Sequence, residues 1–154
     1  ALNMSEGRGT TIPFELLGAP FVNTSKLIKN LSSRKIPGCA FRVHDFIPTF
    51  NKYSGQFCNG FQIHVTDPSV YRPVATAYEV FDAIIETSPA DSLKFNPPPY
   101  EYEYKLIPFN ILSGDSVMRT SLCERVKPET EFQRWKSEIS EFKNEFSQIA
   151  FYKE

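Results

Sequence analysis

Residues 61–66 read Phe-Gln-Ile-His-Val-Thr, and this stretch decides the fold class. Apolar and polar side chains alternate without a break, and successive side chains of a strand point to opposite faces of its sheet. The stretch therefore predicts a strand with one apolar face and one polar face, the latter carrying Gln62, His64 and Thr66. A polar row of this kind is usually a solvated face, but a histidine between Gln and Thr also suits a ligand-binding wall near neutral pH.

A second strand and a long loop are predicted just before this stretch. Residues 39–50 alternate more loosely until Pro48, and residues 51–56 read Asn-Lys-Tyr-Ser-Gly-Gln. With its neighbours this polar connection is about ten residues long, which is long for a simple hairpin. Long loops often carry function. Lys52 and Tyr53, a cation and a phenol, are therefore candidate binding residues.

Helices are predicted on both sides of these strands. A first helix begins at Asn23 or Thr24, either of which can cap it, and ends before Pro37-Gly38. A second helix is predicted after Asp67-Pro68, where apolar residues from Val74 to Ile85 recur at helical spacing. A short helix is expected over residues 115–124.

The clearest element is an amphipathic helix at the C-terminus. Thr130 and Gln133 predict a capping box at its start. A single helix of this kind typically seals a domain core, because a coiled coil needs the pattern sustained for longer. Its apolar stripe steps by three and four residues through Phe132, Trp135, Ile139, Phe142, Phe146 and Ile149.

Residues 89–108 contain five of the twelve prolines and predict an extended crossing segment. Within it, tyrosine and glutamate alternate from Tyr100 to Tyr104. This alternation favours a half-buried edge strand, with stacking on sugars as the alternative. Taken together, the patterns predict one α+β domain over residues 1–154, with a small mixed β-sheet covered by three to four helices.

Composition excludes several classes of function. The 154 residues carry 17 Lys and Arg against 18 Asp and Glu, which gives no electrostatic case for a nucleic-acid partner. No apolar run reaches the roughly 18 residues that a membrane span requires. The three cysteines form no disulfide or zinc pattern, and the two histidines lack a third ligand at metal spacing. We therefore predict no membrane span, no metal and no cofactor.

The N-terminal loop Ser5-Glu6-Gly7-Arg8-Gly9-Thr10-Thr11 holds an arginine between two glycines. The planar guanidinium suits recognition of an anion or a sugar carboxylate, and Glu6 can orient it or bind hydroxyls. The motif is not a P-loop, because the terminal Lys-Ser/Thr and the spacing are absent. On residue types alone, a structural turn in which Arg8 pairs with Glu6 or Glu15 is favoured.

Several motifs in order resemble the carboxy-terminal domain of the exo-β-N-acetylmuramidase (NamZ-type) family of bacterial cell-wall glycosidases. The resemblance extends over nearly the whole chain. The opening Ala1-Leu2-Asn3-Met4 has no initiator methionine, and we expect the chain to be a piece of a longer protein. The motifs are Ser5–Thr11, Pro48-Thr49-Phe50, Lys52-Tyr53, Cys58–Asp67, Pro99–Glu103 and Pro108–Gly114.

The resemblance implies an enzyme that removes terminal N-acetylmuramic acid from peptidoglycan fragments. In this family an amino-terminal Rossmann-like domain holds the principal catalytic carboxylate, an auxiliary domain like this one follows it, and the substrate pocket lies where the two meet. N-acetylmuramic acid carries a lactyl carboxylate, for which Arg8, Lys52 and His64 are possible partners. The implied site residues are Glu6 and His64 for catalysis and Arg8, Thr10, Lys52, Tyr53 and Gln62 for substrate binding.

Glycoside hydrolysis normally needs two carboxyl groups about 5–9.5 Å apart. The chain offers Glu6 but no second acid at a recognisable spacing, so we predict that it is inert without the Rossmann-like domain. The resemblance also implies a location in the periplasm or outside the cell. Two other interpretations stay open: a non-catalytic carbohydrate-binding module, and a structural cap that docks through the apolar stripe of residues 132–149.

Overall fold

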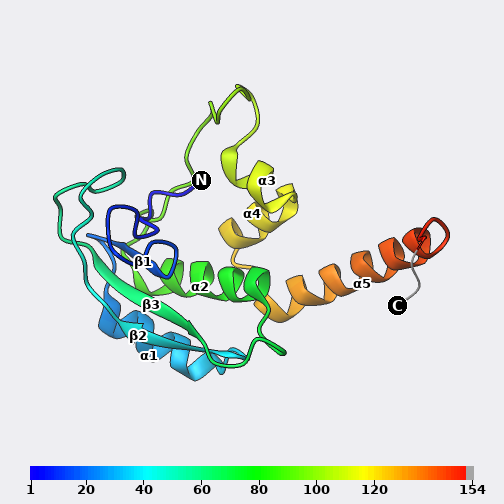
Figure 1. Cartoon of the computed structure of the whole chain (residues 1–154), viewed down its shortest axis with the longest axis horizontal. Helices are drawn as coiled ribbons and strands as arrows, with labels where there is room; N and C mark the ends of the chain where they lie inside the picture. Colours follow the sequence, from blue (N-terminus) through cyan, green and yellow to red (C-terminus); the bar gives the residue numbers. More distant parts are fainter. Residues whose placement is uncertain (152–154) are drawn as a thin grey trace.

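The computed structural model describes residues 1–151 and forms three strands and five helices over them (Figure 1). The α+β class predicted from the sequence is confirmed. Within the described range, no helix is both long enough and apolar enough to cross a bilayer. In chain order the elements are β1 (Leu16–Ala19), α1 (Thr24–Arg34), β2 (Cys39–Val43), β3 (Asn59–Val65), α2 (Pro73–Thr87), α3 (Pro108–Ser113), α4 (Ser116–Cys123) and α5 (Pro128–Ser147).

The sheet has the order β1-β3-β2, and β3 is antiparallel to both of its neighbours. The prediction of a mixed sheet is therefore wrong. β1 and β2 run in the same direction, as expected for strands joined by the crossover helix α1. However, β3 lies between β1 and β2, so each pair of neighbouring strands in the described residues is antiparallel.

The core lies between β3 and the first two helices. Phe61 of β3 stands opposite Leu17 of β1 and is fully buried. It belongs to one apolar cluster with Leu27 and Leu31 of α1 and Tyr78 of α2. The predicted apolar face of the strand is thus confirmed at Phe61, which packs where both helices meet the sheet.

A second, smaller cluster is centred on Leu16, Phe46 and Cys58. An isolated bridge between Phe46 and Cys58 continues the pairing beyond β2. β2 itself ends at Val43, so the strand predicted over residues 39–50 is shorter than expected. The segment 44–58 then forms the loop that carries Lys52 to the site described below.

Local signals explain where the helices begin. Of the two possible caps of α1, Asn23 is the one that forms, because its Oδ1 accepts a hydrogen bond from the backbone N–H of Lys26 at 3.0 Å. α2 starts with Pro73, whose fixed φ suits a first helical position. Asp115 caps α4 by accepting from the N–H of Val117 at 2.8 Å.

α5 begins three residues earlier than a cap at Thr130 would place it. Lys127 is the N-cap residue and makes no side-chain cap, and Pro128 occupies the first turn. The predicted capping box is wrong, because proline provides the start signal instead. Phe132 and Trp135 pack edge-on against Tyr78, with ring centroids 6.1 and 5.8 Å apart respectively.

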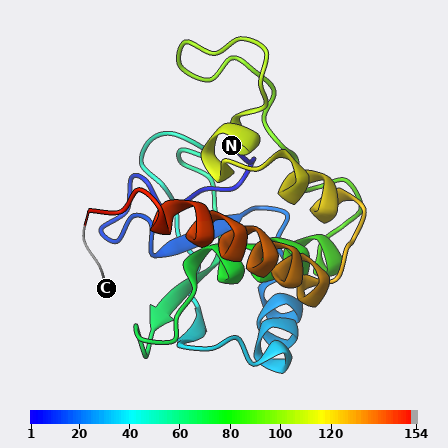
Figure 2. The same cartoon turned by 90° about the vertical axis from the view of Figure 1, so that its right-hand side faces the viewer.

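The far half of α5 leaves the body of the molecule. Figure 1 shows its orange-to-red end standing away from the sheet, and in Figure 2 the same helix crosses in front of the other elements. Its remaining stripe residues are exposed, so the helix seals the core only through its first turns, contrary to the prediction for the whole stripe. These exposed residues are Ile139, Phe142, Phe146 and Ile149.

Residues 97–106, which we call the arm, form a projecting loop in place of the predicted edge strand (Figures 1 and 2). Tyr100 and Glu103 exchange backbone hydrogen bonds of 2.8 and 3.0 Å and close a tight turn. Tyr102 and Tyr104 are exposed, so the prediction of a half-buried edge strand is wrong. The chain then enters α3, a helix that the proline-rich sequence did not predict.

Candidate functional site

The N-terminal loop is held by β1 and by its own glycines. Ser5 exchanges backbone hydrogen bonds with Gly18 of β1 at 2.8 and 3.0 Å. Gly7 and Gly9 adopt φ values of 74° and 82°, which glycine tolerates and other residues rarely adopt. This backbone conformation places Arg8 in a tight turn, which the N–H of Thr10 closes by donating to the carbonyl of Gly7 at 3.1 Å.

The 44–58 segment docks on this loop through Gly9. The carbonyl of Gly9 accepts hydrogen bonds from the backbone N–H and the hydroxyl of Thr49, at 3.1 and 3.0 Å. A Cβ at Gly9 would lie 2.7 Å from the Thr49 nitrogen and 2.8 Å from the Phe50 nitrogen. The close approach of two backbones therefore requires glycine, and it brings Lys52 to Glu6.

Glu6, Arg8 and Lys52 form a cluster of two ion pairs that share one carboxylate. Glu6 Oε1 lies 2.8 Å from Arg8 Nε, and Glu6 Oε2 lies 2.9 Å from Lys52 Nζ. The side chain of Arg8 is 49% exposed, whereas Glu6 and Lys52 are 27% and 28% exposed. The predicted structural pairing of Arg8 with Glu6 is confirmed, and the cluster keeps one net positive charge.

The charge state of Glu6 follows from this geometry. Burial by itself would raise the pKa of Glu6, but the hydrogen bond from Lys52 and the attraction of Lys52 and Arg8 outweigh burial and lower the pKa. Glu6 is therefore a carboxylate at neutral pH. A general acid in glycoside hydrolysis needs a raised pKa, so the arrangement suits Glu6 to orienting its two cations or accepting hydrogen bonds from hydroxyls.

Arg8 also contacts an aromatic ring. Its guanidinium carbon lies 5.3 Å from the centroid of Phe14, within the range of a cation–π contact. Phe14 adopts a φ of 69° and its ring is largely exposed. The ion pair with Glu6 and the contact with Phe14 together restrict the position of the Arg8 guanidinium.

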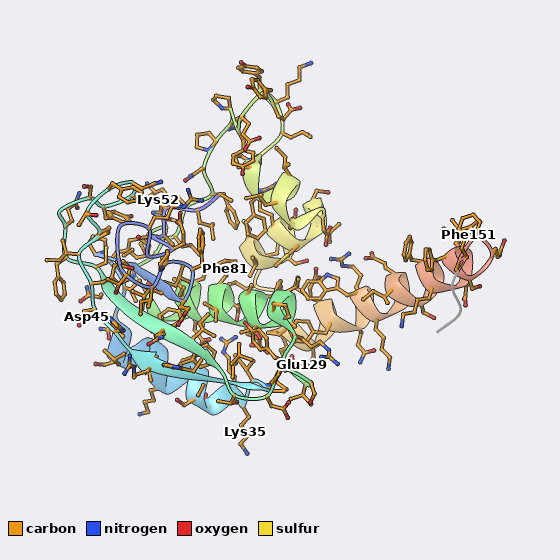
Figure 3. The ribbon with its side chains drawn as sticks, viewed as in Figure 1. Lys35, Asp45, Lys52, Phe81, Glu129 and Phe151 are labelled. Atoms are coloured by element: carbon orange, nitrogen blue, oxygen red, sulfur yellow. The ribbon has the colours of Figure 1, made fainter. Side chains whose placement is uncertain are left out.

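Two cavities, each of about 440 Å³, open beside the cluster and share Glu6 and Lys52 in their walls. The first, the charged cavity, adds Arg8, Phe14 and the base of the arm. The second, the apolar cavity, is lined mainly by aliphatic and aromatic side chains. Figure 3 labels Lys52 and Phe81, which come from the 44–58 segment and from α2 and both line the apolar cavity.

Thr10 and Tyr53, two predicted binding residues, use their hydroxyls to hold these loops. The Thr10 hydroxyl donates to the carbonyl of Gly7 at 2.6 Å and accepts from the N–H of Ile12 at 3.3 Å. The Tyr53 hydroxyl donates to the carbonyl of Asn3 at 2.8 Å. Both residues lie close to the cluster in sequence, and their contacts position the loops that form it.

Gln62 is engaged inside the sheet region. It is only 6% exposed, its Nε2 donates to Glu15 at 2.8 Å, and its Oε1 accepts from Arg42 at 2.7 Å. The expected solvated face is therefore wrong at this position. Gln62 lies on the central strand, opposite Leu16 of β1 and Arg42 of β2, and this position between two strands explains its burial.

His64 lies further along β3, opposite Ala40 of β2. Its Nε2 is buried and has no hydrogen-bond partner within the described part of the chain. Neither of the two cavities that Glu6 and Lys52 share has His64 in its wall. The structure thus brings together Glu6, Arg8 and Lys52, and it does not join His64 to them.

The sequence did not single out Phe14 as a site residue, and it gave sugar stacking by Tyr100 to Tyr104 only as an alternative to an edge strand. Phe14 stands just after Pro13, and its role depends on a positive φ that an aromatic residue rarely adopts. Pro97, Pro99 and Tyr100 reach the charged cavity from a segment about ninety residues away along the chain. The proline cluster was visible in the sequence, but its position in space was not.

Comparison with known proteins places these observations in a family. A family model described as "Exo-beta-N-acetylmuramidase NamZ, C-terminal" matches residues 1–152. The chain is 33% identical over 150 residues to the peptidoglycan beta-N-acetylmuramidase NamZ of Bacillus subtilis (strain 168). That match covers 97% of this chain and 34% of the relative, so the chain spans about a third of the relative's length.

The fold is also similar to that of a solved structure. A crystal structure of a DUF1343 family protein from Bacteroides fragilis NCTC 9343 matches with a TM-score of 0.77 and 22% sequence identity. The match covers 98% of this chain and 38% of the solved chain. Because the family model spans nearly every residue and the Bacillus subtilis relative is 33% identical, the chain belongs to the family of NamZ C-terminal domains.

Proposed function

We propose that this chain forms one wall of the substrate pocket of a peptidoglycan exo-β-N-acetylmuramidase. The observation that carries the proposal is the cluster of Glu6, Arg8 and Lys52 at the mouth of two cavities. Family membership supports the same function, since the Bacillus subtilis relative is named as a peptidoglycan beta-N-acetylmuramidase. The ligand is a terminal N-acetylmuramic acid residue of a peptidoglycan fragment.

Arg8 and Lys52 bind the lactyl carboxylate in this proposal. Arg8 meets Glu6 through Nε, and a guanidinium has further N–H donors in the same plane with which it binds a second carboxylate. Glu6 neutralises part of the charge of both cations, which keeps them close together without a ligand. A bound carboxylate then neutralises the remaining positive charge.

The reacting carboxylic acid comes from the Rossmann-like domain that precedes a C-terminal domain of this kind. Glu6 is held ionised by Lys52 and Arg8, so it does not supply the proton to the leaving group. It acts as a positioning residue for the two cations. His64 Nε2 makes no hydrogen bond among residues 1–151, and its predicted catalytic role requires a group from the Rossmann-like domain to reach β3.

The test uses the complete polypeptide and a chromogenic β-N-acetylmuramide. Arg8→Ala and Lys52→Ala are expected to lower kcat/KM about tenfold or more, because each removes a charge-assisted contact. Arg72→Ala and Lys29→Ala, which change exposed cations elsewhere, are the matched controls. Full activity in the Arg8 and Lys52 variants would overturn the proposal.

The 154-residue chain alone is expected to give no turnover of the same substrate. It supplies one wall and no acid with a raised pKa from the cluster. Turnover by the chain alone at the rate of the complete polypeptide would show that the active site lies within it, and that the second domain is not needed.

We also propose that the protein works in the periplasm or outside the cell, where its substrate lies. The support is the substrate class implied by the family. Fractionation of the native organism, with detection of the complete protein by antibody, tests this proposal. Recovery in the cytoplasmic fraction alone contradicts it.

A second candidate function is a structural cap for the Rossmann-like domain of the same polypeptide. The exposed stripe on α5 favours it, because Ile139, Phe142 and Phe146 leave an apolar surface open to water. In this case Phe142→Ser with Phe146→Ser reduces the stability of the complete polypeptide, whereas Arg8→Ala leaves both its stability and its activity unchanged. Loss of activity in Arg8→Ala with unchanged stability selects the pocket instead.

A further inference from the structure

The arm extends the candidate site beyond its cavity. Pro97, Pro99 and Tyr100 at the base of the arm line the charged cavity together with Arg8 and Lys52. The tip stands clear of the body in both views of the molecule (Figures 1 and 2). Two aromatic side chains near the tip, Tyr102 and Tyr104, are 93% and 71% exposed.

The segment that leads into Glu6 also anchors the arm. Asn96 donates its backbone N–H to the carbonyl of Ala1 at 2.8 Å, and Asn3 donates its own to the carbonyl of Lys94 at 3.0 Å. The Asn3 side chain adds a second connection, because its Oδ1 accepts from the N–H of Lys94 at 2.7 Å. The arm and the charged cluster are therefore fixed relative to each other through residues 1–6.

The other end of the arm returns directly to packed structure. Ile107 packs against the core, and Pro108 begins α3 and lines the charged cavity. Phe95, just before the arm, packs edge-on against Phe109 with ring centroids 4.9 Å apart. Packed residues therefore hold both ends of the arm, only a few residues along the chain from its tip.

The turn at the tip is braced by its own hydrogen bonds. Tyr100 and Glu103 close the turn through backbone bonds, and Glu103 Oε1 accepts from the N–H groups of Lys105 and Leu106 at 2.6 and 3.1 Å. Prolines at 97–99 restrict the backbone on the approach. The tyrosines are therefore presented on a preorganised support, which lowers the entropy lost when a ligand binds.

The composition of the tip fits a hydrated ligand better than a protein core. Tyr102 and Tyr104 alternate with Glu101, Glu103 and Lys105, so each ring has charged neighbours. A tyrosine ring offers one apolar face and one hydroxyl, which suits a surface that is apolar in one part and wet in another. A sugar has this character, whereas the Ile and Phe side chains of α5 are the kind that a protein surface buries.

We propose that the arm is a second saccharide-binding element, in which Tyr102 and Tyr104 stack on the sugar that adjoins the residue held in the charged cavity. This inference rests on the proposed function and extends it from the terminal sugar to the next one. The arm then favours substrates in which the terminal N-acetylmuramic acid is followed by another sugar. It takes no part in binding the lactyl carboxylate.

The test compares two substrates in the complete polypeptide. One is a tetrasaccharide with a terminal N-acetylmuramic acid, and the other is N-acetyl-β-muramyl fluoride, which has the same muramyl group but no adjoining sugar. Tyr102→Ala combined with Tyr104→Ala is expected to lower kcat/KM about tenfold on the tetrasaccharide and less than about twofold on the fluoride. Replacing both residues by Phe, which keeps the rings, is expected to restore most of the activity on the tetrasaccharide.

Phe57→Ala removes a different exposed aromatic ring and is the control. Equal losses on both substrates, or no loss on the tetrasaccharide, would overturn the role of the arm. An equal loss accompanied by a lower melting temperature would identify the arm as a contact with the second domain, which also overturns the proposal.

Calorimetric binding of the tetrasaccharide separates this inference from the proposed function. Suppose that the wild-type protein hydrolyses neither substrate but binds the tetrasaccharide, and that the double Ala variant does not bind it. This result would refute the proposed hydrolase function and support saccharide binding by the arm. Binding that is equal in wild type and variant refutes the arm, whatever the activity.

Discussion

Glu6 sets the character of the site at the scale of single residues. One carboxylate holds two cations at 2.8 and 2.9 Å, although the three side chains come from loops more than forty residues apart. Without it, Arg8 and Lys52 would repel each other at the same cavity mouth. The Glu6 carboxylate therefore allows Arg8 and Lys52 to lie close together, and the cluster still carries one net positive charge.

The pKa of Glu6 leads to a prediction for the dependence of stability on pH. The folded-state pKa lies below the ordinary value of 4.5, so the stabilisation from Glu6 is fully present above that value and is lost as the pH falls through the lowered pKa. Urea unfolding should show that Glu6→Gln costs about 1 kcal/mol near pH 7, and that the difference from wild type shrinks as the pH falls through the lowered pKa of Glu6. A difference that grows on acidification would contradict the assigned ion pairs.

Gly9 and Gly55 allow a matched test of the loop contact. Both adopt positive φ, at 82° and 71°, but a Cβ at Gly9 meets two backbone nitrogens, whereas a Cβ at Gly55 meets no atom of residues 1–151 within 4 Å. We expect Gly9→Ala to cost about 2–4 kcal/mol of unfolding free energy and Gly55→Ala about 1–2 kcal/mol. Equal costs measured by chemical denaturation would mean that the loops do not approach as closely as described.

At the scale of elements, α5 divides into a packed part and an exposed part. Trp135 packs against Tyr78 and donates its Nε1–H to Glu131 at 3.1 Å, whereas Phe142 contacts Phe146 on the open half of the helix. In the 154-residue chain, Trp135→Ala is expected to cost about 2–3 kcal/mol, and Phe142→Ala less than about 0.5 kcal/mol. Thermal unfolding of both variants tests this, and a large loss in Phe142→Ala would place the far half of α5 against the body.

The elements that the sequence predicted are those specified by local patterns. Apolar spacing predicted α1, α2 and α5, and strict alternation predicted β3. α3 was missed because its proline at position 108 belongs to a run that favours extended structure, yet proline is also favoured in the first turn of a helix. The strand directions were missed because the insertion of β3 between β1 and β2 is a property of the whole sheet.

At the scale of the whole molecule, the site combines segments from three regions of the chain. Residue chemistry together with the family resemblance predicted Glu6, Arg8 and Lys52, which do meet. The same reasoning added His64 as a possible anion partner on the predicted polar face of the strand. The register places His64 opposite Ala40 of β2, and among the described residues it lines neither of the two cavities. Sugar stacking by Tyr100 to Tyr104 was the alternative to an edge strand, but the position of the arm beside the cluster was not predicted, because no local pattern shows where a proline-rich segment goes.

The central claim is that Arg8 and Lys52 recognise a carboxylate on the substrate. Its most direct test is the ratio of kcat/KM for an N-acetylmuramide with a free lactyl carboxylate to that for the corresponding methyl ester, measured with the complete polypeptide. The wild-type protein is expected to prefer the free carboxylate by about tenfold or more, and Arg8→Ala combined with Lys52→Ala is expected to lose most of that preference. The same preference in wild type and variant would contradict the claim.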